Sequence, residues 1–388
     1  MRKISVISSS RADYGLLKNL LLKLKKDKSI KLNFYVTGAH LIENFGKTIN
    51  QIKEDKIKIK KKILINFNND KHFDVSKAIS QGIRNFSIEF EKEKPDILLI
   101  LGDRYEIFSA AIAAMIYQIP IAHLHGGEST EGAIDESIRH SISKMSHIHF
   151  VSTKKYSHRL CQMGENKKTI FDVGSLGVEN IKGINLYNIK EIKKKYKINL
   201  KKKTFVITLH PETLLNSSKK NTQILLNSLK RFKDINFVFT MPNADTGYKE
   251  INKGITNFCK NNKNSFYFKS LGQRAYFSIC KYANCVIGNS SSAIIEAPSL
   301  FTPSINIGIR QQGRVSASTV INSKFNEKNL TQDKKKSFNL KKKIKKDKLE
   351  FKNPYEKKGT SSNIVRILKS INLDNILIKK FKDYEISK

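Results

Sequence analysis

Three acidic side chains in the first half of the chain occupy positions where proteins commonly place groups that transfer protons. Asp103 directly follows a continuous apolar run, and Glu128 follows two consecutive glycines. Asp135 precedes Arg139 by four residues, so both lie on one face of a helix and can form an ion pair. Carboxylates whose pKa values are held apart can divide the roles of base and acid between them. Two plain alternatives stay open: Asp103 as a helix N-cap, and the Asp135–Arg139 pair as an exposed salt bridge.

Hydroxyl and basic side chains in other segments suit a phosphate group. The segment SSRADYG, which contains Arg11, opens a helix, where backbone N–H groups attract anions. A capped Ser/Gly turn is the plain alternative. In the second half, the turn GNSSSAIIE offers Ser290 and Ser291 to a diphosphate and Glu296 to ribose hydroxyls, and Arg310 lies in a glycine-flanked loop. The sequence contains neither a GxGxxG motif nor a P-loop, so it does not predict a dinucleotide fold or a P-loop NTPase.

Histidines occur in two of the segments that follow apolar runs. His210 ends such a run and is expected to face a ligand, and the segment HLHGGE places His123 and His125 just before Glu128. The second pattern can bind a metal, so a metal hydrolase is a rival interpretation. It lacks the third-ligand spacing of known metal motifs, and we therefore expect no metal site.

The balance of charge is strongly basic. The chain has 388 residues and a formal net charge of +38, which by itself would suit a nucleic-acid partner. However, only eleven of the 72 basic residues are arginines, and the lysines are scattered as on solvated faces. We therefore expect the densest lysine run, 334–348, to be exposed, and we expect no nucleic-acid partner. Because arginine is scarce, we expect it at positions that need a planar, permanently charged guanidinium. Five arginines lie in candidate loops: Arg11, Arg104, Arg139, Arg310 and Arg314.

The sequence predicts neither a membrane protein nor a secreted one. No apolar run approaches the roughly 18–20 residues of a membrane span. The first residues are predicted to form a strand rather than a signal peptide, because their apolar run is short and no cleavage site follows it. The four cysteines show neither CxxC spacing nor a disulfide framework. We expect a cytoplasmic protein without a membrane partner.

Alternating strand-like and helix-like segments predict an α/β fold of two Rossmann-like domains, each with a parallel sheet. We place them at 1–175 and 176–359, with a helical linker at 188–203 and a helix over 360–388 that packs back on the first domain. The carboxyl ends of both sheets are expected to face one cleft. The predicted strands are 3–9, 32–37, 97–101, 119–124, 148–152 and 169–173, then 204–209, 236–241, 265–268, 285–287 and 303–307. Helices predicted in the first domain are 16–25, 75–92, 105–117 and 137–145.

Taken together, these segments make the chain resemble the hydrolysing UDP-N-acetylglucosamine 2-epimerases of sialic-acid-type biosynthesis. The likeness extends over almost the whole chain, and the motifs occur in the family's order. They are SSRADYG, GDRYEIFSAAIAA, HGGE, DESIRHSISKMSHIHF, VGSLG, HPET, NADTG, GNSSS and INIGIRQQGR. The resemblance implies a glycosyltransferase-B type fold, no metal or redox cofactor, and a homodimer or homotetramer.

The resemblance also implies roles for individual residues. It assigns Asp103, Glu128 and Asp135 to acid/base catalysis, pairs Arg139 with Asp135, and places His210 beside the diphosphate. Non-hydrolysing relatives usually carry Glu where this chain has Asp135, which favours hydrolysis. The residues that it implies for binding the substrate and its UDP are Arg11, Arg104, His210, Asn243, Ser290, Ser291, Glu296 and Arg310.

The implied substrate is a UDP-amino-sugar, with UDP-N-acetylglucosamine as the first choice. Loss of UDP together with the C2 proton gives a 2-acetamidoglucal, and addition of water then gives the free manno sugar ManNAc, which feeds nonulosonic-acid biosynthesis. One alternative is the same reaction on UDP-2,4-diacetamido-2,4,6-trideoxyglucose, as in the legionaminic-acid route. Also open are a non-hydrolysing UDP-GlcNAc 2-epimerase, a glycosyltransferase of the same fold, and a nucleotide-sugar-binding protein without turnover.

Overall fold

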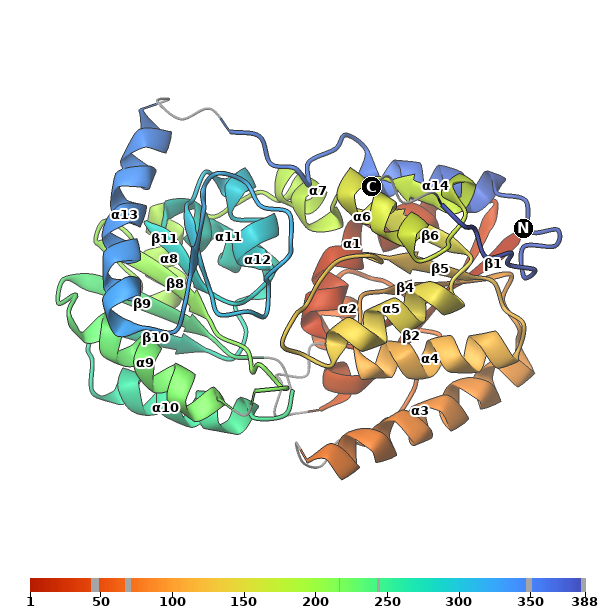
Figure 1. The fold of residues 1–388 in the computed structure, drawn as a ribbon, viewed down its shortest axis with the longest axis horizontal. Coiled ribbons are helices and arrows are strands. Elements are labelled where there is room, and N and C mark those ends of the chain that lie inside the picture. The colour runs from red at the N-terminus through yellow and green to blue at the C-terminus, as the bar shows by residue number, and fades with distance from the viewer. Residues whose placement is uncertain (43–48, 67–70, 216, 243–244, 347–350, 385–388) are drawn as a thin grey trace. The chain divides into compact units, whose positions relative to one another are not determined.

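The computed structural model describes residues 1–42, 49–66, 71–215, 217–242, 245–346 and 351–384. The chain divides into two compact units. The first unit comprises Met1–Glu128, Asp135–Asn180 and Lys357–Lys388, and the second comprises Ser129–Ile134 and Ile181–Glu356. Figure 1 shows the elements of both units along the chain.

The first unit is built on a parallel sheet with the strand order β3-β2-β1-β4-β5-β6-β7. Its central part has the order typical of a doubly wound fold, in which the strand order reverses between β1 and β4. Its strands are β1 (Arg2–Ser8), β2 (Ile30–Val36), β3 (Lys61–Lys62), β4 (Ile97–Leu101), β5 (Ile121–Leu124), β6 (Ile148–Val151) and β7 (Ile170–Asp172). Its helices are α1 (Arg11–Lys26), α2 (Ile49–Glu54), α3 (His72–Lys92), α4 (Tyr105–Ile116), α5 (Asp135–Met145), α6 (Lys154–Gln162), α14 (Thr360–Ser370) and the start of α7 (Leu176–Gly183).

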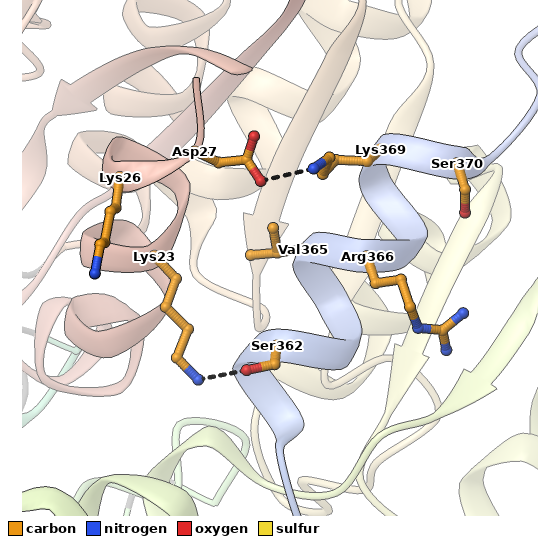
Figure 2. A pocket seen from close by; sticks show the side chains of 8 residues that line it. All are labelled: Lys23, Lys26, Asp27, Ser362, Val365, Arg366, Lys369 and Ser370. Carbon is orange, nitrogen blue, oxygen red and sulfur yellow. Dashed lines mark hydrogen bonds and ion pairs between the residues drawn. The ribbon is translucent and has the colours of Figure 1, made fainter. Parts of the chain in front are cut away.

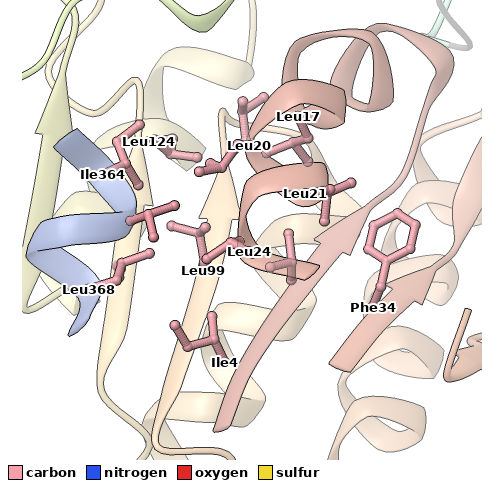
Figure 3. Packing of buried hydrophobic residues seen from close by; sticks show 14 of the residues in the cluster. Ile4, Leu17, Leu20, Leu21, Leu24, Phe34, Leu99, Leu124, Ile364 and Leu368 are labelled. Carbon is pink, nitrogen blue, oxygen red and sulfur yellow. The ribbon is translucent and has the colours of Figure 1, made fainter. Parts of the chain in front are cut away.

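Helices cover both faces of this sheet, which explains why its central strands are continuous apolar runs. In β4, Leu99 faces a cluster that includes α1 and α14, while Leu98 faces the cluster that includes α3, α4 and α5. Figure 3 shows the first of these clusters, with Ile364 and Leu368 of α14 beside the leucines of α1 over the strands. The sheet therefore has a buried core on each side.

The second unit repeats this plan with a parallel sheet in the order β10-β9-β8-β11-β12-β13. One face packs on α9, α10 and α13, and the other packs on α8, α11 and α12. Its strands are β8 (Lys203–Thr208), β9 (Ile235–Thr240), β10 (Ser265–Phe268), β11 (Cys285–Gly288), β12 (Ser304–Ile307) and β13 (Val320–Ser323). Its helices are α8 (Ile189–Tyr196), α9 (Ser218–Lys230), α10 (Tyr248–Lys260), α11 (Gly272–Tyr282), α12 (Ser292–Ile295) and α13 (Glu327–Lys345). The predicted α/β class with parallel sheets is thus confirmed.

Four sequence-based expectations about elements were wrong. The edge strands β3 and β13 were not predicted, because edge strands are short and carry exposed polar residues. The linker predicted as a helix over 188–203 is helical only in α8, because Lys197 adopts a left-handed conformation with φ of 59°. The helix predicted over 360–388 ends at Ser370, after which the side chain of Asn372 accepts a hydrogen bond from the backbone N–H of Asp374 and favours a turn.

The lysine run predicted to be exposed contains two buried lysines, and for them the prediction was also wrong. Lys334 and Lys341 lie on α13, on the face that packs against the unit. The ammonium of Lys334 donates to the hydroxyl of Ser228 at 2.6 Å. That of Lys341 donates to the carbonyl of Phe301 and the hydroxyl of Thr302, both at 2.9 Å. Their spacing of seven residues, two helical turns, places both on one face.

Candidate active site

Asp103 and Arg139 form an ion pair at the carboxyl end of the first sheet. Asp103 follows β4, next to the point where the strand order reverses, and open α/β sheets bind ligands at such points. Arg139 lies on α5 and is buried, and its terminal NH2 nitrogen donates to Oδ2 of Asp103. The Asp103 side chain keeps 16% of its surface exposed. A partly exposed carboxylate thus stands beside a fixed, permanently charged cation.

Glu128 is buried and is held by side chains from two neighbouring strand ends. Its Oε1 lies 2.7 Å from Nδ1 of His125 and accepts a hydrogen bond from the hydroxyl of Ser152 at the same distance. Its Oε2 lies 4.0 Å from a guanidinium nitrogen of Arg139, which also donates to the carbonyl oxygen of His125. His125 has a φ of 66°, an uncommon conformation for a residue other than glycine, and such outliers cluster at functional sites. Arg139 therefore contacts both Asp103 and Glu128.

Asp135, the third predicted acid, is the first residue of α5 and is partly buried. Its place one turn before Arg139 follows from the helix itself. Its role in acid/base chemistry stays a prediction.

The histidines of the HLHGGE segment are bonded to protein groups. Nε2 of His123 lies 2.8 Å from the carbonyl oxygen of Gly102, and Nδ1 lies 3.2 Å from the hydroxyl of Ser143. Burial lowers the pKa of His123 to about 3, so the ring is neutral near pH 7. Among the described residues, no group of three His, Cys, Asp or Glu side chains is arranged to hold a metal ion.

The loop after β1 is organised by Asp13. Its carboxylate accepts hydrogen bonds from the backbone N–H groups of Ser9 and Ser10 and from the hydroxyl of Ser9, and Ser10 completes a capping box. The capped turn, which was the plain alternative for this segment, is therefore present. Arg11 is the first residue of α1 and is partly buried, so its predicted contact with a substrate stays a prediction.

Arg104 bonds to a neighbour within the first unit. Its Nε donates to Oε2 of Glu106 at 3.2 Å, and its guanidinium lies over the ring of Tyr105 at 5.4 Å. Burial raises the pKa of the Glu106 carboxyl, and the charge of Arg104 opposes that shift. The predicted contact between Arg104 and UDP stays a prediction.

In the second unit, His210 and Asn289 join the two central strand ends. The backbone N–H of His210, after β8, donates to Oδ1 of Asn289 at 2.7 Å, and Nδ2 of Asn289, after β11, donates to the carbonyl oxygen of His210 at 2.9 Å. The strand order of this sheet reverses between β8 and β11, and open α/β sheets commonly bind ligands at such points. Ser290 and Ser291 follow Asn289 at the start of α12 and stay partly exposed.

Arg310 lies in the loop after β12 and is buried beside the same strand ends. A terminal nitrogen of its guanidinium donates to the carbonyl oxygen of Asn289 at 3.2 Å, while Nε has no hydrogen-bond partner among the described residues. Oε1 of Glu212 accepts from the backbone N–H groups of Ile309 and Arg310, which fixes the start of the loop. Glu296 is buried in the turn after α12. Asn243, also predicted to bind UDP, lies outside the described residues.

Several residues at these sites were missed by sequence reasoning. Ser152 contacts Glu128 but carries no motif of its own, whereas His125, which also contacts Glu128, was considered only as part of a possible metal site. Gln311 is 2% exposed, and neither its amide nitrogen nor its amide oxygen has a hydrogen-bond partner in the described part of the chain. Its place directly after Arg310 was the only available signal. A buried amide without partners is costly unless a ligand or water satisfies it.

The groove drawn in Figure 2 contains none of the predicted site residues. It lies between the last turn of α1 and α14 and has a volume of about 720 Å³. Its polar groups bind one another: Lys369 pairs with Asp27 at 2.9 Å, and Lys23 donates to the hydroxyl of Ser362 at 2.8 Å. The basic side chains of Lys26 and Arg366 point away from each other in the view. These contacts join α14 to the first unit. No described helix is long and apolar enough to cross a membrane.

Comparisons with known proteins match these features over nearly the whole chain. The chain is 43% identical to the GDP/UDP-N,N'-diacetylbacillosamine 2-epimerase (hydrolyzing) of Campylobacter jejuni, over 98% of this chain and 99% of that protein. It is 40% identical to the polysialic acid biosynthesis protein P7 of Escherichia coli, over 99% and 97%. The structure of the Neisseria meningitidis UDP-GlcNAc 2-epimerase bound to UDP-GlcNAc superposes with a TM-score of 0.78 at 19% identity, covering 95% of this chain and 99% of that chain, and confirms the fold.

The model of one protein family provides the remaining comparison. The UDP-N-acetylglucosamine 2-epimerase family model matches residues 22–369. That span includes both sheets apart from β1, together with Asp103, Glu128 and Asp135 of the first unit and the turns after β11 and β12 of the second. The chain therefore belongs to the UDP-N-acetylglucosamine 2-epimerase family.

Proposed function

We propose that this protein is a hydrolysing 2-epimerase that converts a UDP-2-acetamido sugar into UDP and the free manno-configured sugar. The observation that carries the proposal is the contact of one buried arginine, Arg139, with two carboxylates, Asp103 and Glu128, just past two neighbouring strands. A pair of acids in unequal surroundings is what a reaction needs when one group must remove a proton and another must deliver one.

The reaction is an elimination followed by hydration. The C2 hydrogen of the sugar is weakly acidic and becomes removable as the bond from C1 to the diphosphate oxygen breaks. One carboxylate of the Asp103–Glu128 pair takes the C2 proton, a C1–C2 double bond forms, and UDP leaves with the electrons of the C1–O bond. Water then adds its oxygen to C1, and a proton is delivered to C2 on the face that gives the opposite configuration. Asp135, one helical turn from Arg139, serves as a third acid/base or positioning group.

The second unit supplies the groups for the departing diphosphate. The groups suited to the negative charge that grows on UDP in the transition state are the partly exposed hydroxyls of Ser290 and Ser291, the ring of His210, and Nε of Arg310, which has no partner among the described residues. Glu296 accepts from the ribose, and the amide of Gln311, which has no partner in the described part of the chain, provides a further donor and acceptor. Arg11, Arg104 and Asn243 complete the proposed contacts with the substrate.

Two substrates compete under this proposal. UDP-N-acetylglucosamine is the first, and UDP-2,4-diacetamido-2,4,6-trideoxyglucose, which is UDP-N,N'-diacetylbacillosamine, is the second. The name of the Campylobacter relative favours the second substrate, and that of the Escherichia relative fits a sialic-acid route. Both sugars carry the same acetamido group at C2, so the proposed chemistry is common to them. They differ at C4 and C6, where contacts set the choice.

The test is turnover in heavy water, followed by NMR with each sugar nucleotide in turn. The expected products are UDP and a free manno sugar that carries deuterium at C2. A product without deuterium at C2 would exclude the elimination mechanism, and UDP-ManNAc without free sugar would identify a non-hydrolysing epimerase. We further propose that the enzyme acts in the cytoplasm as a homodimer or homotetramer, and light scattering at working concentration tests the oligomeric state.

A further inference from the structure

The six residues Ser129–Ile134 leave the first unit and belong to the second. We call them the crossover segment. Glu128 immediately precedes this segment and Asp135 immediately follows it, and both belong to the first unit. The crossover segment thus joins two proposed acid/base groups, and its conformation limits where each of them can lie.

Arg314 of the second unit holds the start of the crossover segment. Its Nε donates to the carbonyl oxygen of Ser129 at 2.6 Å, and a terminal nitrogen donates to the hydroxyl of Thr130 at 3.3 Å. Ser129 and Thr130 are almost fully buried. A guanidinium can present these two donors side by side, whereas the ammonium of a lysine is a single point of charge.

Other contacts hold the remaining part of the crossover segment. The hydroxyl of Thr213 accepts from the backbone N–H of Ile134 at 3.2 Å, and the backbone N–H of Leu214 donates to the carbonyl oxygen of Gly132 at 3.1 Å. Gly132 has a φ of 77°, and a Cβ atom there would come within 2.8 Å of the side chain of Ile309. Contacts with other residues of the second unit therefore hold four of the six residues: Ser129, Thr130, Gly132 and Ile134.

The residues that hold the crossover segment lie in the same two loops as the proposed diphosphate-binding groups. Thr213 follows His210 by three residues, and Arg314 follows Arg310 by four. Oε1 of Glu212 binds the second loop to the first through the backbone N–H of Arg310 at 3.1 Å. The loops that would bind UDP are thus the loops that hold the crossover segment.

We infer that Arg314 is a positioning residue for catalysis: by binding Ser129 and Thr130 it fixes the crossover segment, and through it the placement of Glu128 and Asp135. The inference rests on the proposed function, because the two acids are the proposed acid/base groups. Arg314 itself touches no reacting atom under this inference, in contrast to Arg310. Loss of its fork is therefore expected to slow turnover while UDP still binds.

The experiment compares Arg314→Lys with the wild-type enzyme in steady-state turnover and in UDP calorimetry. We expect kcat to fall about 10- to 100-fold, the scale of a misplaced catalytic group, with the dissociation constant of UDP changed by less than about threefold. Thr130→Ala removes one of the two acceptors and should give a smaller loss. In the double variant the losses should combine to less than their product, because both changes remove one contact. Arg231→Lys, an exposed arginine of the second unit, is the matched control.

Hydrogen–deuterium exchange supplies a readout that does not depend on turnover. In Arg314→Lys, amides of the crossover segment should exchange faster, while those of β8 and β11 keep wild-type protection. Unchanged exchange in the segment would overturn the inference, as would a kcat within twofold of wild type or a loss that lies wholly in UDP affinity. Failure of the wild-type enzyme to release UDP would reject the proposed function instead, while the exchange result would still decide whether Arg314 holds the segment.

Discussion

Ser152 donates a hydrogen bond of 2.7 Å from its hydroxyl to Oε1 of Glu128, and thereby joins the end of β6 to the segment that follows β5. The same carboxylate oxygen lies 2.7 Å from Nδ1 of His125. With Arg139 near its other oxygen, Glu128 is held in a single orientation within a buried site. A reacting carboxylate benefits from such support, because small displacements of a catalytic group are costly.

Ser152→Ala should therefore lower kcat about tenfold, because a hydrogen bond to a charged group contributes roughly 1.5 kcal/mol. The Michaelis constant and the UDP affinity should change little, because Ser152 supports Glu128 and not the nucleotide. Ser152→Thr, which keeps the hydroxyl, should recover part of the loss. Ser146→Ala is the matched control, since Ser146 is also buried but its hydroxyl donates to the carbonyl of Ile142 rather than to a carboxylate. Equal kcat values for Ser152→Ala and wild type would contradict the prediction.

Asp103→Asn and Glu128→Gln should each lower turnover by about a hundredfold or more, a common scale for a lost acid/base group. Calorimetric affinity for UDP should stay close to wild type, because the proposed diphosphate contacts belong to the second unit. The exposed Asp234 offers a control, and Asp234→Asn should behave as wild type. Whichever of the two variants retained a near-wild-type rate would identify a residue that is not catalytic.

Arg310→Lys should weaken both UDP binding and turnover. The change keeps the positive charge but removes Nε, the donor without a partner in the described chain, and the bond from the guanidinium to Asn289. Because charge grows on the leaving diphosphate, the loss in kcat/KM should exceed the loss in UDP affinity. The control is Arg366→Lys on the exposed side of α14. If calorimetry and kinetics gave equal values for Arg310→Lys and wild type, the diphosphate would have to bind elsewhere.

Gln311→Leu should raise the melting temperature of the free protein while weakening UDP binding. The buried amide has two polar atoms without partners among the described residues, each of which costs roughly 1–3 kcal/mol when unsatisfied. An apolar side chain of similar size removes that cost from the free protein, and it removes a donor and an acceptor from the complex. Differential scanning calorimetry with and without UDP measures both effects. A lower melting temperature with unchanged UDP affinity would show that the amide serves the fold and not the ligand.

Lys334, one of the two buried lysines of α13, makes stability depend on pH. Burial lowers the pKa of Lys334 from 10.5 to about 7. Between these two values the unfolded chain binds a proton that the folded protein does not, so the free energy of unfolding contributed by this group rises with pH from about 7 to about 10.5. Below pH 7 the penalty is constant.

Lys334→Met should therefore raise the free energy of unfolding near pH 7 by roughly 1–4 kcal/mol and flatten its rise in the alkaline range. The hydroxyl of Ser228 loses the lysine but still donates to the carbonyl of Leu225 at 2.5 Å, so this hydroxyl keeps a partner after the change. Urea unfolding at pH 7 and pH 10 measures the effect. Lys336→Met is the control, because the side chain of Lys336 is 66% exposed. A destabilised Lys334→Met protein at pH 7 would refute the prediction.

The α/β class and most central strands could be predicted because buried parallel strands require continuous apolar runs. The strands predicted at 97–101 and 265–268 have the same bounds as β4 and β10 in the structure. Edge strands do not follow this rule. β3 consists of two lysines, and only its pairing with β2 identifies it as a strand. The burial of Lys334 and Lys341 could not be predicted for a similar reason. A lysine-rich sequence does not indicate which of its lysines the neighbouring helix and strands will cover.

The residue types of the site were determined by the sequence alone: acids, serines and arginines follow the strands, and parallel strands bring their carboxyl ends to one edge. Tertiary structure alone decided which of these groups touch. Arg139 was expected beside Asp135 because helical spacing is local, yet it bonds to Asp103, 36 residues away, and approaches Glu128. No sequence motif indicates that Ser152 contacts Glu128 or that Arg314 contacts the crossover segment. Those partners depend on the packing of separate strands and loops, and a pattern of neighbouring residues contains no such information.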